Sequence, residues 1–197
     1  MNLNKTIIGM IHVQALPGTP NHKMSLSEIS ALAVAKAADL DFIRAEGFVF
    51  GHLADEGYID SCAGELMRYR KMIEADKVKV FTDIKKKHSS HAITSDVDIV
   101  ETAHAAEFFL SDGLIVTGSS TGKAVDLREL DALKDSVSKP VLIGSGITVD
   151  NITDYWDYAN AFIIGSHFKE NGFWVNPISN ERLLVFMNKV EILRSKK

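Results

Sequence analysis

The chain has little of what marks secreted, membrane-embedded or nucleic-acid-binding proteins. It contains a single cysteine, Cys62, so no internal disulfide can form and a reducing compartment is expected. No apolar run approaches the ~20 residues of a membrane span, and the first five residues lack the apolar core of a signal peptide. The net charge of −4 gives no general attraction for nucleic acids or anionic membranes. We therefore expect a cytoplasmic protein without membrane insertion and without a nucleic-acid partner.

Linkers, low-complexity tracts and short repeats are also missing. The 197 residues are 46% hydrophobic and 24% charged, which suits a substantial core and argues against disorder. One domain spanning residues 1–197 is the expectation.

What the sequence has is a regular alternation of apolar runs and helical patterns, which is typical of parallel α/β proteins. Strands are expected at Thr6–Val13, Asp41–Ala45, Val78–Ile84, Gly113–Thr117, Val141–Ile143 and Ala161–Ile164. Helices are expected at Leu26–Ala38, Asp60–Ala75, Ile99–Leu110, Leu127–Val137, Thr148–Tyr158 and Asn180–Leu193. A closed barrel of this kind has eight βα units and ~250 residues. The pattern therefore predicts an α/β fold of the TIM-barrel type with about six βα units, two short of a closed barrel.

Two glycine–serine turns follow the last two predicted strands. The first is Gly144-Ser145-Gly146 and the second is Gly165-Ser166. Glycine lets backbone N–H groups approach an anion, and a following helix N-terminus adds partial positive charge. One such turn also occurs where nothing binds, but many (β/α)8 barrels build a phosphate site from two in tandem. We therefore predict that these five residues bind a phosphate-type group.

Several segments closely resemble the BtpA/SgcQ family. They are the opening residues 7–20 and the later segments 41–47, 63–70, 83–88, 116–122 and 144–148. The resemblance extends from residue 6 to about residue 190 and implies a TIM barrel of the ribulose-phosphate-binding type. In that family, one branch is linked to photosystem I biogenesis. Another lies in predicted sugar-utilisation systems, where a nucleosidase-like or sugar-phosphate role is suggested.

Compared with the family, the chain lacks two βα units after the opening motif, where only residues 21–38 remain. Two arrangements are open. Either the first strand pairs directly with what is normally the fourth, or the barrel stays open with two exposed edges. Because an exposed parallel edge favours pairing with another chain, we expect a homo-oligomer.

The candidate catalytic residues lie at the carboxyl ends of strands, where TIM barrels carry their active sites. Alternation along the third strand places Asp83, Lys85 and Lys87 on one face, opposite Lys86. A nearby aspartate can shift the pKa of a lysine or orient it as an acid, base or anion clamp. We predict Asp83 and Lys85 as catalytic residues and Lys86 as a surface residue. The alternative is that residues 85–87 form a solvated loop exit.

Other polar residues at strand ends allow a functional and a structural interpretation. His12 is predicted as a third catalytic residue, although a lone histidine is as often a structural hydrogen-bonding residue. Arg44 and Glu46 either contact substrate or form an ion pair at the barrel rim. Thr117 and Gly118 open a small-residue loop that contacts a sugar or phosphate, or that is an ordinary βα turn.

The histidines His88 and His91 have ligand-type side chains, but His-x-x-His after a strand is not a standard zinc spacing. We predict neither a metal nor a cofactor. Two functions stay open. The first is binding or converting a phosphorylated sugar or nucleoside-like metabolite. The second, suggested by the photosystem branch, is a non-enzymatic assembly or biogenesis factor for a membrane protein complex, which would use exposed strand edges to bind its partner.

Overall fold

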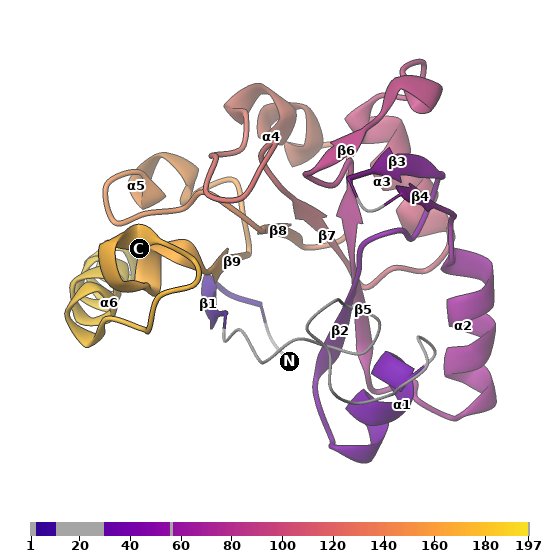
Figure 1. The fold of residues 1–197 in the computed structure, drawn as a ribbon, viewed down its shortest axis with the longest axis horizontal. Coiled ribbons are helices and arrows are strands. Elements are labelled where there is room, and N and C mark those ends of the chain that lie inside the picture. The colour runs from indigo at the N-terminus through magenta and orange to yellow at the C-terminus, as the bar shows by residue number, and fades with distance from the viewer. Residues whose placement is uncertain (1–2, 11–29, 56, 197) are drawn as a thin grey trace.

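Six parallel strands form one sheet that curls into an open half-barrel (Figure 1). The computed structural model describes residues 3–10, 30–55 and 57–196. In their order across the sheet, the strands are β1 (Thr6–Gly9), β9 (Ala161–Ile164), β8 (Val141–Ile143), β7 (Gly113–Val116), β5 (Lys79–Ile84) and β2 (Phe42–Ala45). The predicted TIM-barrel-type fold with an incomplete barrel is therefore confirmed.

The first and second strands are the two edges of this sheet. Within the described residues, β1 pairs only with β9, and β2 pairs only with β5. Of the two arrangements that the sequence leaves open, the structure has the second, because β1 and β2 do not pair. Within the described residues, each of these two strands thus has a neighbour in the sheet on one side only.

Helices lie outside the curved sheet, with α1 and α2 beside its β2 end and α6 beside its β1 end (Figure 1). The helices are α1 (Ser30–Ala37), α2 (Ala63–Met72), α3 (Ile99–Phe108), α4 (Leu127–Lys134), α5 (Ile152–Tyr155) and α6 (Asn180–Ser195). Short 3-10 helices add η1 (Ala92–Thr94), η2 (Ser166–Phe168) and η3 (Glu170–Gly172). Among the helices of the described residues, none is long and apolar enough to cross a membrane.

Alternation along the strands separates two layers of the core. Val80, Leu114 and Phe162 belong to the larger cluster, which includes residues of the outer helices such as Leu130 and Phe186. The intervening strand residues form a smaller cluster, made of Phe81, Ile115, Leu142, Ala161 and Ile163. A parallel sheet that is covered on both faces reads as nearly continuous apolar runs, which is why the strands were recognisable in the sequence.

A small antiparallel sheet was not predicted. It consists of β3 (His52–Ala54), β4 (Gly57–Ile59) and β6 (Ser89–Ser90). Strands of three or two residues are too short to show an alternating pattern, so no periodic signal marks them. The sheet brings the loop after β2 against the loop after β5, on the carboxyl side of the barrel strands.

Several predicted elements are longer than the structure has them. The helices expected at Asp60–Ala75 and Leu127–Val137 are Ala63–Met72 and Leu127–Lys134. The helix expected at Thr148–Tyr158 is the single turn α5, because Thr148 and Asn151 hydrogen-bond each other before the helix begins. The first strand was expected to reach Val13 and the first helix to begin at Leu26. Residues 11–29 lie outside the described residues, and so does the candidate catalytic residue His12.

Candidate functional site

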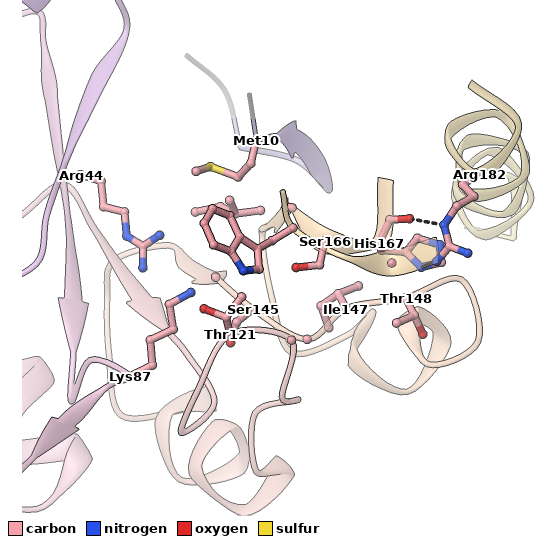
Figure 2. Close-up of a pocket in the computed structure, with 17 residues that line it drawn as sticks. Met10, Arg44, Lys87, Thr121, Ser145, Ile147, Thr148, Ser166, His167 and Arg182 are labelled. Carbon is pink, nitrogen blue, oxygen red and sulfur yellow. Dashed lines mark hydrogen bonds between the residues drawn. The ribbon is translucent and has the colours of Figure 1, made fainter. Parts of the chain in front are cut away.

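A cavity of about 390 Å³ opens at the carboxyl ends of the strands (Figure 2). The turns after β8 and β9 form one wall, while Arg44 from β2 and Lys87 from the loop after β5 form another. A volume of this size suits a small metabolite. The position agrees with the active-site end of TIM barrels.

Both predicted glycine–serine turns line this cavity. All five of their residues take part: Gly144, Ser145, Gly146, Gly165 and Ser166. In the described part of the chain, the backbone N–H groups of Ser145, Gly146 and Ser166 have no hydrogen-bond acceptor. Unpaired amides beside a cavity are suited to bind an anion. The helix N-termini add little partial positive charge to the site, since η2 and α5 are single turns.

Two of the predicted binding residues hold the loops of the site together. The Ser145 hydroxyl accepts a hydrogen bond from the Gly118 N–H (2.8 Å) and donates one to the Lys123 carbonyl (3.2 Å). The Thr117 hydroxyl accepts a hydrogen bond from the Lys87 N–H (2.9 Å). Neither Thr117 nor Gly118 lines the cavity, whereas Thr121 and Gly122 of the same loop do. Thr117 and Gly118 therefore position the cavity wall.

Arg44 and Asp83 form a bidentate ion pair across β2 and β5. The guanidinium donates to the two carboxylate oxygens at 2.7 and 2.6 Å, and the side chain of Asp83 is fully buried. Burial raises the pKa of Asp83, although the hydrogen bonds and charge of Arg44 oppose this. Burial also disfavours the charge of Arg44, but Asp83 outweighs it and raises the pKa of the guanidinium. Arg44 therefore keeps its charge at the cavity, while Asp83 is committed to holding it.

Lys87 contributes the other cation at this end of the cavity. Figure 2 shows the side chains of Arg44 and Lys87 pointing toward the same region. Burial and repulsion by Arg44 lower the pKa of Lys87, although the charges of Asp83 and Glu46 oppose this. Its ammonium has no hydrogen bond or ion pair with any residue that the structure describes. Lys87 thus presents its positive charge to the cavity without a direct carboxylate partner among the described residues.

Lys85, the lysine predicted to be catalytic, does not line this cavity. The strand ends at Ile84, and Lys85 has a left-handed backbone conformation (φ 51°). Its ammonium donates to the Thr94 carbonyl at 3.1 Å. The left-handed residue interrupts the alternation on which the prediction for Lys85 was based, so Lys87 reaches the cavity and Lys85 does not.

The prediction that Lys86 is a surface residue is wrong. Lys86 is 7% exposed, and its ammonium lies 2.9 Å from the Glu46 carboxylate. Burial opposes ionisation of Glu46, but the hydrogen bond and charge of Lys86 outweigh it and lower the pKa of this carboxyl. Glu46 does not line the cavity. The structure therefore shows the ion-pair alternative for Glu46.

The histidines after β5 bind neighbouring parts of the chain. His88 Nε2 accepts a hydrogen bond from the Thr121 N–H (3.2 Å), and His91 Nε2 lies 3.0 Å from the Lys86 carbonyl. Across residues 3–10, 30–55 and 57–196, no group of three or more His, Cys, Asp or Glu side chains could hold a metal ion. These two histidines thus stabilise loops of the site.

Arg182 is a site residue that the sequence did not indicate. It lies in the first turn of α6, lines the cavity and donates to the His167 carbonyl at 2.6 Å. Burial and the charge of Arg182 lower the pKa of His167. No sequence signal marks Arg182, because only packing of α6 beside η2 brings it to the turn after β9. Among the described lining residues, the charged side chains are therefore cations, and no carboxylate is present.

A model of the BtpA family matches residues 27–192. The chain belongs to the BtpA family. It is 48% identical over 183 residues to an uncharacterized mitochondrial protein of Caenorhabditis elegans, covering 93% of this chain and 65% of that protein. It is 34% identical over 169 residues to the photosystem I biogenesis protein BtpA of Synechocystis, covering 85% of this chain and 58% of that protein. The chain thus spans less than two thirds of the length of either relative.

Solved TIM-barrel proteins share the fold at low sequence identity. Phosphoribosyl anthranilate isomerase from Thermus thermophilus matches with a TM-score of 0.55 and 16% identity, over 83% of this chain and 67% of that one. Thiamine phosphate pyrophosphorylase from Pyrococcus furiosus matches with a TM-score of 0.51 and 16% identity, over 82% and 66%. At this identity the likeness shows the fold alone.

Proposed function

We propose that this BtpA-family protein binds a phosphorylated small metabolite, a sugar phosphate or a nucleoside-like phosphate, in the cavity at the strand ends. The observation that carries the proposal is the charge of the cavity wall. Arg44, Lys87 and Arg182 line it, and no described lining residue is a carboxylate. An environment of cations and unpaired amides favours an anion over a neutral or cationic ligand.

The phosphate belongs at the two glycine–serine turns. There the N–H groups of Ser145, Gly146 and Ser166 are unpaired within the described residues, and Arg182 supplies a charge beside them. Backbone amides bind phosphate oxygens without the entropy cost of ordering long side chains. The same contacts would hold the ligand whether the protein converts it or only binds it.

If the bound metabolite is converted, Lys87 is the residue placed to move a proton. It faces the cavity, and burial and Arg44 lower its pKa, which favours the neutral amine that a general base needs. Asp83 is unsuited to this role because both of its carboxylate oxygens are bound to Arg44.

A second candidate function is that of an assembly factor for a membrane protein complex. It is supported by the name of the Synechocystis relative, a photosystem I biogenesis protein, and by the two open sheet edges. An edge strand can bind a partner by adding a strand from it. This function needs no ligand in the cavity, which separates it from the first.

The test is a thermal-shift scan of the 197-residue chain with inorganic phosphate, pentose phosphates and nucleoside monophosphates. A ligand that binds only the folded state stabilises it by roughly 2.7 kcal/mol at 100 times its Kd. We expect one phosphorylated class to raise Tm, and Arg182→Met to abolish the rise. Lys77→Met, which removes an exposed lysine that does not line the cavity, is the matched control. A cooperative melt that no ligand shifts would favour the assembly-factor function instead.

A further inference from the structure

The loop between η3 and α6 brings a tryptophan to the cavity. Trp174 lines the cavity and is 48% exposed. The loop is closed by hydrogen bonds of its own backbone. The Glu170 N–H donates to the Pro177 carbonyl at 2.9 Å, and the Asn176 N–H donates to the Phe173 carbonyl at 3.0 Å. Trp174 therefore lies within a tight turn that fixes where its backbone sits at the cavity.

This loop lies against the cationic wall of the cavity. An added Cβ at Gly172, two residues before Trp174, would lie 3.5 Å from Nη2 of Arg182. Gly172 and Arg182 line the same cavity as the two glycine–serine turns. A ligand that places its phosphate on these turns and fills the cavity of about 390 Å³ therefore also contacts Trp174.

Apart from its cations and glycines, the cavity wall offers apolar surface and few side chains that accept hydrogen bonds. The apolar lining residues beside Trp174 are Met10, Ile147 and Ile163. No Asp, Glu, Asn or Gln is among the described lining residues, and the Ser145 hydroxyl already donates to the Lys123 carbonyl. A row of sugar hydroxyls needs acceptors for its O–H donors, whereas a flat ring needs an aromatic or apolar face. The wall therefore suits a ring better than a row of hydroxyls.

We propose that the ligand carries a nucleobase, which stacks on Trp174 while the phosphate lies on the glycine–serine turns. This inference rests on the proposed function, because it selects one ligand class for the same cavity, the nucleoside monophosphates rather than the simple sugar phosphates. Every base has a π face that can stack on an indole, so Trp174 strengthens binding without selecting among bases. Trp174 thus binds the ring, and the turns with Arg182 bind the phosphate.

The test compares ligands that share a ribose 5-phosphate group and differ in the base. Ribose 5-phosphate is compared with adenosine and uridine 5′-monophosphates by titration calorimetry at constant ionic strength. Stacking of one base on one aromatic side chain strengthens binding by roughly tenfold to a hundredfold. We therefore expect at least one monophosphate to bind about tenfold more tightly than ribose 5-phosphate, or better. Inorganic phosphate is the reference ligand, because it cannot stack.

Tryptophan fluorescence tests the same contact in the unchanged protein. Of the two tryptophans of the chain, Trp156 is 5% exposed and stacks on Phe162, with ring centroids 5.7 Å apart. Trp174 is therefore the tryptophan that a ligand in the cavity can reach. With excitation at the red edge of the tryptophan band, saturation with a monophosphate should quench its emission, and inorganic phosphate should not. Unchanged emission at saturation would overturn the inference without any variant.

Variants assign the preference to Trp174. Trp174→Leu should reduce the affinity ratio between a monophosphate and ribose 5-phosphate to about one, while inorganic phosphate binds as before. Trp174→Tyr keeps an aromatic face and should retain much of the ratio. The matched control is Phe173→Leu, since Phe173 is 55% exposed on the same loop and does not line the cavity. Thermal melts check that each variant is folded.

Three further results would contradict the inference. Equal affinities of ribose 5-phosphate and both monophosphates would overturn it, and so would a Trp174→Leu variant that keeps the full ratio. Equal weakening of all the phosphorylated ligands in that variant would mean that Trp174 supports the phosphate site instead of binding a base. In each case phosphorylated ligands would still bind the unchanged protein, and the proposed function would stand. Failure of every phosphorylated ligand would overturn both.

Discussion

At the scale of single residues, the charged side chains of the site are of two kinds. Asp83 with Arg44, and Glu46 with Lys86, form compensated pairs. Lys87 has no carboxylate partner among the described residues, although it too is partly buried. Compensated charges hold strands and loops in place, while an uncompensated charge at a cavity is available for a ligand. Stability measurements distinguish the two kinds of charge.

Lys87→Met should stabilise the ligand-free protein, raising Tm by about 2 °C. Burial and Arg44 lower the pKa of Lys87 below its ordinary 10.5, so the folded state binds this proton more weakly than the unfolded state does. The ammonium therefore destabilises the fold at neutral pH, and the penalty disappears as pH rises through the folded pKa toward 10.5. Thermal melts from pH 7 to pH 10 should show the gain shrinking with pH. A lower Tm would mean that Lys87 has a structural partner.

Gly146→Ala should destabilise the protein by about 3 kcal/mol and distort the cavity. Gly146 has φ 73°, and an added Cβ would lie 2.3 Å from the backbone of Lys123. Gly122→Ala is the matched control, since Gly122 has φ 79° but no atom within 4 Å of the added Cβ. Its free energy of unfolding should fall only by the cost of a left-handed alanine, ~1 kcal/mol. If urea unfolding shows equal losses of stability for the two variants, the close approach of Gly146 to Lys123 is unimportant.

At the scale of elements, the site depends on ties between neighbouring strands and loops. The pair Arg44 and Asp83 joins β2, an edge strand, to β5. The antiparallel sheet of β3, β4 and β6 joins the loops that follow these two strands. Since β2 has a neighbour on one side only, these ties replace the pairing that a closed barrel would supply.

Asp83→Asn should destabilise the protein by about 3 kcal/mol, because it leaves the mostly buried Arg44 guanidinium without its counter-charge. Chemical denaturation measures the loss. Asp126→Asn is the control. It also breaks a carboxylate–arginine pair, with Arg128, but that pair is exposed and asparagine retains the helix cap of α4. Unchanged stability in Asp83→Asn would contradict the role of this ion pair in holding β2 to β5.

His52 in β3 should make the protein sensitive to acid. Burial, together with the charges of His91 and Lys86, lowers the pKa of His52 below 6.5. Within the described residues, its Nε2 has no hydrogen-bond partner. As pH falls below 6.5, the unfolded state gains this proton first, so stability is lost until the folded pKa is passed. Chemical denaturation at pH 7.5 and pH 5 measures how much stability is lost on acidification, and His52→Phe should make this loss smaller. His104→Phe, at an exposed position of α3, should not.

At the scale of the whole molecule, the open half-barrel leaves β1 and β2 at its edges, each with one neighbouring strand within the described part of the chain. Both edge strands are short and mostly apolar, with sequences TIIG and FIRA. Edges without lysine or proline are poorly protected against pairing with a second chain. We propose on this basis that the protein self-associates.

Sedimentation velocity should reveal this association as a weight-average sedimentation coefficient that rises with concentration. The expected species is a homo-oligomer in which edge strands of two copies meet. A second measurement, hydrogen exchange at high and low concentration, should show added protection in β1 or β2. A monomer at all concentrations would mean that the edges are protected in another way.

Element positions were predictable from local pattern alone. The bounds expected for β8 and β9 match the structure, because both strands are short apolar runs ended by glycine. The start of α3 at Ile99 was also expected, and there Asp98 and Glu101 form a capping box. The pairing of β1 with β9 rather than β2 could not be read from the sequence, because pairing depends on how the whole sheet curves.

The sequence by itself determined the parallel α/β class, the number of barrel strands and the two glycine–serine turns, because each follows from the local spacing of apolar residues and glycine. It determined the family through the resemblance of several segments to that family. Tertiary structure decided which charges reach the cavity. The left-handed backbone of Lys85 directs Lys87 rather than Lys85 to the cavity. Packing of α6 brings Arg182 to His167, 15 residues earlier in the chain. Such placements depend on one backbone angle or one long-range contact, and neither leaves a periodic trace in the sequence.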